Sequence, residues 1–141
     1  MSATTGFFLH PSSPLHDTGW NHPEHQGRLR ALASAVGQDL LTLHDHVVQM
    51  EHSEATNEDL MRVHTEAHVD RVREAWEVAQ AQDAITQLDS DTRVSAASWD
   101  AAVGSAGTAI AAAAAVTEGR ILSAFVAARP PGHHATPDRA M

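Results

Sequence analysis

Apolar residues gather in three short runs that are separated by longer amphipathic segments. Residues 6–9 form the first run, which is followed by His10 and Pro11, residues 46–50 form the second, and residues 121–128 form the third. Runs of this length, rich in Phe, Val and Ile, are typical of β-strands. We therefore predict three strands, and the proline ends the first of them.

Residues 23–37 show the spacing of an amphipathic helix. Pro23 suits a first turn because it has no N–H that needs a partner, and Gly37 is a plausible end. The apolar positions recur every three or four residues, at Leu29, Leu32, Ala33 and Val36. The preceding residues 12–21 mix Ser, Pro, His, Asp and Gly, which predicts a loop.

Two further helices are predicted in the middle of the chain. Thr56, followed three residues later by Asp59, has the pattern of a capping box and predicts a short helix with Leu60 and Val63 facing inward. Thr65 marks a second helix start. One apolar stripe follows it, made of Val69, Val72, Trp76 and Ala79.

A long alanine-rich helix is predicted before the third strand. Ser95 is a good N-cap, and Gly119 follows the last helical residues. Gly104 and Gly107 lie inside this helix and allow close packing on a sheet. Strands that alternate with helices indicate an α/β fold, a parallel sheet with helices on both faces.

The composition restricts the class of function. Nine basic and eighteen acidic residues give a net charge of −9, which disfavours binding to nucleic acid or to an anionic membrane and favours cationic substrates. The 141 residues suffice for one domain, and the absence of cysteine excludes disulfides and thiolate chemistry. No apolar run reaches membrane-spanning length and residues 1–5 lack a basic signal-peptide start, so we expect a cytoplasmic location.

The candidate chemistry lies in residues 129–135, Arg-Pro-Pro-Gly-His-His-Ala, directly after the third strand. Eleven histidines among 141 residues predict about one adjacent pair by chance, so the pair has meaning only with its neighbours. The two prolines stiffen the backbone, and Gly132 permits a sharp turn. A turn lets His133 and His134 share a pocket, which adjacent strand residues cannot do. Two imidazoles at the carboxyl end of such a strand could transfer protons near neutral pH.

This stretch resembles the His-His motif of the zinc-dependent histone deacetylase superfamily, including its bacterial acetoin-utilisation and acetylpolyamine-amidohydrolase-like members. Three weaker resemblances occur in the family's order: residues 22–24 with Arg28 and Leu29, residues 63–69, and residues 89–92. The resemblance implies an arginase/deacetylase-like α/β fold. Residues 1–141 would be the incomplete, N-terminal part of a single such domain.

The resemblance also implies roles for individual residues. His133 and His134 stand at the positions of the catalytic pair. Substrate contacts fall on Gly132 and on Asp91, and Arg28 takes the place of an arginine that points inward beneath the active site.

Other interpretations of these residues stay open. Asp89 is the alternative to Asp91, and both carboxylates could instead stabilise the next helix start through its dipole. Arg28 could equally be a solvated arginine. Residues 129–135 could be a Pro-Gly turn with incidental histidines.

The cofactor implied by the resemblance is zinc, and the implied substrate is the amide of acetyl-lysine or of an acetylated amine. The family's Asp-x-His motif and its tyrosine are absent from the sequence, so the zinc ligands are expected beyond Met141 and the isolated chain is expected to be inactive. A parallel sheet that lacks neighbouring strands should also self-associate through its exposed edge.

Two other functions compete with a deacetylase. The chain could be a non-catalytic truncated fragment that lacks the zinc site. It could also be a His-rich metal-binding module that uses residues 44–46, or His22 with His25. His64 and His68 have the spacing of a metal site on a helix, but packing and hydrogen bonding at the helix start explains them better.

Overall fold

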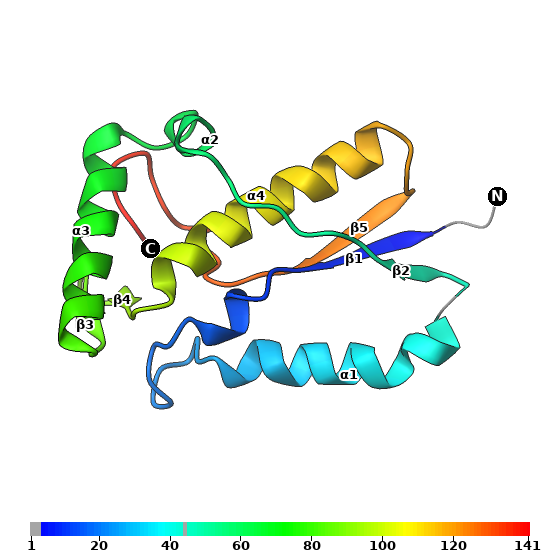
Figure 1. Cartoon of the computed structure of the whole chain (residues 1–141), viewed down its shortest axis with the longest axis horizontal. Coiled ribbons are helices and arrows are strands. Elements are labelled where there is room, and N and C mark those ends of the chain that lie inside the picture. Colours follow the sequence, from blue (N-terminus) through cyan, green and yellow to red (C-terminus); the bar gives the residue numbers. More distant parts are fainter. Residues whose placement is uncertain (1–3, 44) are drawn as a thin grey trace.

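Three parallel strands form the main sheet of the computed structural model, which describes residues 4–43 and 45–141 with the side chain of Leu40 left out. The strands are β1 (Thr5–Leu9), β2 (Val47–Gln49) and β5 (Ser123–Ala127), in the order β2-β1-β5 (Figure 1). Phe7 of β1 lies opposite Phe125 of β5. The three predicted strands are confirmed; β1 begins one residue earlier than predicted, and β2 and β5 are shorter.

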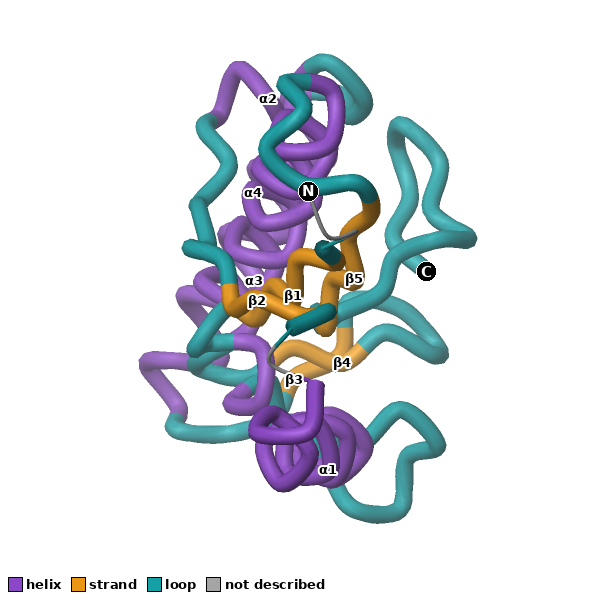
Figure 2. The backbone as a smooth tube through the Cα atoms, turned by 90° about the vertical axis from the view of Figure 1, so that its right-hand side faces the viewer, coloured by secondary structure: helices purple, strands orange, loops and turns teal. Residues whose placement is uncertain are grey.

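Helices cover both faces of this sheet, as predicted. Phe7 and Phe8 are adjacent, so their side chains point to opposite faces. Phe7 packs with Leu29 of α1 (Gly27–Leu43), whereas Phe8 packs with Ala112 and Ala115 of α4 (Ser98–Thr117). Figure 2 shows α1 and α4 on opposite sides of the strands.

The predicted bounds of α1 were wrong at both ends. Residues 22–26 form turns instead of helix, in which the backbone N–H of Gly27 donates to His25 Nδ1. The helix then continues through Gly37 to Leu43. Gly37 has no positive φ and would have open space around a Cβ, so it is an ordinary helical residue. One interior glycine costs a helix only about 1 kcal/mol, which the flanking residues offset.

The two middle helices start where the sequence predicted. The hydroxyl of Thr56 accepts from the N–H of Asp59, whose carboxylate accepts from the N–H of Thr56, and α2 (Asn57–Met61) follows. Thr65 caps α3 (Glu66–Gln82), in which Val69 and Ala79 are buried. Val63 was predicted to face inward but is 65% exposed, because α2 ends before it.

The alanine-rich helix α4 begins at Ser98, not after a Ser95 cap. The hydroxyl of Ser95 accepts from the backbone N–H of Asp17 instead, and its backbone N–H donates to Ser98 Oγ. Gly104 and Gly107 do allow a close approach, but not of the sheet. A Cβ at Gly104 would overlap the imidazole of His10, and one at Gly107 would overlap the backbone of residues 54–55.

Two features, a hairpin and a 3₁₀ turn, were not predicted. The strands β3 (Thr86–Gln87) and β4 (Arg93–Val94) form a short antiparallel hairpin around the acidic residues 89–91. Inside the predicted loop, Pro14 starts a 3₁₀ turn, η1 (Ser13–Leu15). Both are too short to leave a periodic apolar pattern.

Among the described residues, α4 is the one helix long and apolar enough to cross a membrane by length and composition. By this criterion the prediction that no segment reaches that length was wrong. In the fold, α4 contacts β1, β5 and η1, which are the contacts of a helix that covers a sheet.

Candidate active site

The two adjacent histidines lie on a tight turn beyond the carboxyl end of β5. The N–H of Ala135 donates to the carbonyl of Gly132 at 3.0 Å, and Gly132 has a φ of +68°. This histidine turn, residues 132–135, brings the rings of His133 and His134 to a centroid distance of 4.2 Å. Both side chains are exposed. The predicted turn is therefore present and places the two imidazoles side by side.

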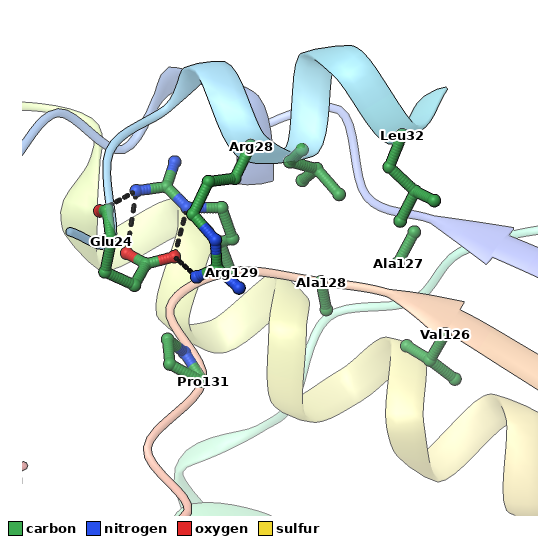
Figure 3. A pocket seen from close by; sticks show the side chains of 9 residues that line it. Glu24, Arg28, Leu32, Val126, Ala127, Ala128, Arg129 and Pro131 are labelled. Carbon is green, nitrogen blue, oxygen red and sulfur yellow. Dashed lines mark hydrogen bonds and ion pairs between the residues drawn. The ribbon is translucent and has the colours of Figure 1, made fainter. Parts of the chain in front are cut away.

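A buried arginine fixes the start of this segment. Arg129 is only 3% exposed, and its guanidinium uses all five N–H groups. Figure 3 shows the bonds to Glu24. Nε and Nη2 donate to the two carboxylate oxygens of Glu24 at 2.6 and 2.8 Å. The other bonds go to the carbonyls of Ser13, His16 and Glu24. Arg129 thereby joins β5 to the loop that follows β1.

The prediction that Arg28 points inward was wrong, and its exposure agrees with the alternative of a solvated arginine. The Arg28 side chain is 59% exposed, and its Nη1 lies 3.4 Å from Glu24 Oε1, one helical turn away. It stands at the rim of a hollow between α1 and β5 that Figure 3 shows. The hollow is lined by Glu24, Arg28, Leu29, Leu32, residues 126–129 and Pro131.

A second anchor holds the chain behind the histidine turn. The N–H of Thr65 donates to the carbonyl of Pro137 at 2.8 Å, and Arg71 donates to the carbonyl of Asp138 at 3.1 Å. His64 Nδ1 lies 3.2 Å from the carbonyl of Thr136. His64 and the buried His68 thus serve packing and hydrogen bonding at the start of α3, as predicted.

The structure separates the two acidic residues that the sequence left as alternatives. The carboxylate of Asp89 accepts from the backbone N–H groups of Asp91 and Thr92 and from the Thr92 hydroxyl, so it shapes the hairpin loop. Partial burial acts to raise the pKa of Asp89, but these hydrogen bonds lower it overall. The Asp91 side chain is 73% exposed, and its Oδ1 lies 3.6 Å from Nε2 of His22. Asp91 is therefore the more exposed of the two carboxylates.

Sequence reasoning missed His16. Its imidazole is buried, with Nδ1 2.7 Å from the hydroxyl of Ser98, and its carbonyl accepts from Arg129. Burial, reinforced by the nearby Arg129 guanidinium, lowers the pKa of His16 to about 4. A neutral imidazole can lie beside the arginine without charge repulsion. The sequence offered no signal for this, because the partners of His16 are more than eighty residues away.

The described residues do not fit a zinc ion on their own. In the ranges 4–43 and 45–141, no group of three or more His, Cys, Asp or Glu side chains could hold a metal. His22 and His25 each accept from a nearby backbone N–H, and His44 of the proposed metal-binding module lies outside the described residues. No chemical step through a metal follows from these residues.

The four segments that carry the family resemblance are connected in space. Glu24 bonds to Arg129, which joins the first segment to the last. His22 approaches Asp91, and residues 64–65 bond to the chain just after the histidine turn. Because β1 and β5 are parallel, the loops that follow them meet at one edge of the sheet, where α/β folds bind ligands.

Comparison with known proteins agrees with this arrangement. A family model described as "Histone deacetylase domain" matches residues 22–141. A "Probable deacetylase" of Archaeoglobus fulgidus is 33% identical over 133 residues, which are 94% of this chain and 35% of that protein. A "Histone deacetylase-like amidohydrolase" of Pseudomonas aeruginosa is 38% identical over 87 residues, 62% of this chain and 22% of that protein.

A solved structure supports the same fold. The "Crystal Structure of HDA15 HD domain" superimposes with a TM-score of 0.85 at 29% identity, over 99% of this chain and 39% of that chain. The chain therefore spans roughly a third, or less, of the length of the curated relatives named above.

Proposed function

Because this chain belongs to the histone deacetylase domain family, we propose that its histidine turn supplies the acid–base groups of a site that hydrolyses amides. The observation that carries the proposal is the pair of imidazoles of His133 and His134, 4.2 Å apart on a turn at the carboxyl edge of the sheet. The proposed substrate is the amide of acetyl-lysine in a protein or of a small acetylated amine. The acidic net charge of −9 supports a cationic amine as the leaving product.

The proposed role of the two histidines is proton transfer. Hydrolysis forms a bond from water oxygen to the carbonyl carbon and breaks the carbon–nitrogen bond, which yields acetate and an amine. One imidazole accepts a proton from the attacking water, and an imidazolium returns a proton to the departing nitrogen. Two rings side by side can divide these tasks, since each proton has a separate destination. Gly132 and Asp91 are the proposed substrate contacts.

Zinc is the cofactor that the resemblance implies, and we propose that its ligands lie outside the described residues. The chemistry assigned to the described residues is confined to proton transfer and substrate contact. A non-catalytic member of the family is the second candidate, favoured by the lack of a metal-binding group among residues 4–43 and 45–141.

A chimera tests the proposal. The segment of the Archaeoglobus fulgidus relative that aligns with this chain is replaced by this chain, and the intact relative serves as the positive control. The substrates are an acetyl-lysine peptide and an N-acetylated diamine, and the products are acetate and free amine. We expect the chimera to hydrolyse at least one substrate that the intact relative also hydrolyses. A folded, metal-loaded chimera without turnover would favour the non-catalytic alternative.

A further inference from the structure

The guanidinium of Arg129 is the main connection between the histidine turn and the rest of the chain on its N-terminal side. Three residues separate Arg129 from His133, and two of them, Pro130 and Pro131, have no N–H to donate. Inside the turn, Ala135 donates to Gly132. The bond within the turn shapes it but does not place it relative to the sheet. Its placement depends on the anchors at either end.

We propose that Arg129 is a positioning residue for His133 and His134, and that Glu24 orients it. The five hydrogen bonds of Arg129 reach the carbonyls of η1 and its neighbouring loop as well as the Glu24 carboxylate, so they fix both the place and the direction of the backbone that leads into the turn. The bond from Ser105 Oγ to the carbonyl of Pro130, at 3.1 Å, supports the same stretch from α4.

The geometry at position 129 requires the guanidinium of an arginine, and another cationic side chain would not replace it. The planar fork of a guanidinium presents Nε–H and one Nη–H to a carboxylate in parallel, whereas a lysine ammonium offers three donors from a single point. A lysine at position 129 keeps the charge but cannot reach the Glu24 carboxylate and the carbonyls of Ser13 and His16 together. The Glu24 side chain is 18% exposed, and both of its carboxylate oxygens accept from Arg129.

Arg28 provides a matched control in the same cluster. It contacts the same Glu24 carboxylate, but from the exposed side and at 3.4 Å. Arg28→Lys removes a guanidinium beside Glu24 without touching the backbone that leads to the histidine turn. An effect of losing any guanidinium contact to Glu24 would appear in both lysine variants, and an effect of positioning would appear only in Arg129→Lys.

The inference rests on the proposed function only where it assigns proton transfer to the histidine turn. The positioning of the turn by Arg129 is therefore tested without a substrate. The chain is compared as wild type, Arg129→Lys and Arg28→Lys. Amide hydrogen exchange is measured at Ala135 in the turn and at Met50, which donates to Phe7 in the sheet. Magnetisation transfer between the imidazole protons of His133 and His134 reports whether the rings stay side by side.

In Arg129→Lys we expect exchange at Ala135 to become at least about tenfold faster relative to Met50, with loss of the transfer between the rings. Arg28→Lys should change neither. Unchanged values in Arg129→Lys, or equal acceleration at Ala135 and Met50, would overturn the positioning role. If Arg129→Lys does not fold, Glu24→Gln gives the same comparison. Unfolding of both variants would also overturn it, because Arg129 would then support the whole fold and not the turn.

Discussion

Burial makes His16 chemically different from an ordinary histidine. Its imidazole, 4% exposed, has a pKa lowered to about 4, first by burial and then by the Arg129 guanidinium. Glu24 and Asp17 act in the opposite direction with smaller effect. The unfolded chain therefore binds a proton at pH values where folded His16 stays neutral.

This difference predicts acid lability. The stability that neutral His16 contributes is complete above the unfolded pKa of 6.5, and it is lost as the pH falls from 6.5 to about 4. A shift of that size corresponds to about 3 kcal/mol. Urea unfolding between pH 7 and 4 should show this loss, with a shallower pH slope in His16→Gln. The same replacement at the exposed His46 controls for removal of an imidazole as such. An identical slope in His16→Gln and wild type would show that His16 is not the cause.

The sequence identified the histidine pair but not the residues that hold it. Arg129 and Glu24 both lie in segments that carry the resemblance, yet they are 105 positions apart, and no local pattern shows that they pair. The family resemblance implied an inward position for Arg28, but its side chain is 59% exposed. The buried arginine is Arg129, two residues after the end of β5.

At the scale of elements, the space around a helical glycine differs from one position to another. Gly37 in α1 has open space where a Cβ would be, whereas Gly104 and Gly107 in α4 face the His10 imidazole and the backbone of residues 54–55. The backbone N–H of Ala55 also donates to the carbonyl of Val103 at 2.9 Å. The loop after β2 is therefore attached to α4 at Gly107 and Val103, whereas His10, which follows β1, lies against Gly104.

Alanine substitutions should separate these cases. Gly37→Ala should stabilise the fold by about 0.5–1 kcal/mol, because alanine loses less entropy in a helix. Gly104→Ala and Gly107→Ala should each destabilise it by about 1–3 kcal/mol, because the added methyl overlaps groups that cannot easily move. Thermal or urea unfolding of the three variants measures this. Equal effects of Gly37→Ala and Gly107→Ala would contradict the close contact between α4 and the loop.

Element types were predictable where local chemistry decides them. The Thr56–Asp59 capping box and the Thr65 cap use partners three residues away, which the sequence displays. The start of α4 was not predictable, because the hydroxyl of Ser95 bonds to Asp17, 78 positions away. The hairpin of β3 and β4 was missed because two-residue strands have no periodicity to detect.

At the scale of the whole molecule, β5 is an edge strand of the sheet that the described residues form. Phe125 is 49% and Leu122 is 69% exposed, and residues 121–128 contain no charge and no proline. Natural edge strands usually carry charged residues or proline, which prevent pairing with another chain. The sheet order β2-β1-β5 thus leaves an apolar strand free to pair with a second copy.

We expect the chain to self-associate through this edge. Sedimentation velocity over a range of concentrations should show dimers or larger species, and Leu122→Lys should shift the population to monomer because a lysine on the edge opposes pairing. Val63→Lys places the same charge on an exposed apolar residue outside the sheet and should have little effect. A monomer at every concentration would refute the role of the edge.

The measurement that tests the central claim most directly is the turnover of the Archaeoglobus fulgidus chimera after separate replacement of each histidine in the turn. His133→Ala and His134→Ala should each lower turnover by about two to four orders of magnitude, while the bound metal content stays constant, because both residues are assigned to proton transfer and not to metal binding. The exposed His46→Ala should retain activity. An active chimera in which both turn variants keep near-normal turnover, or in which either variant loses its metal, would contradict the roles assigned to His133 and His134.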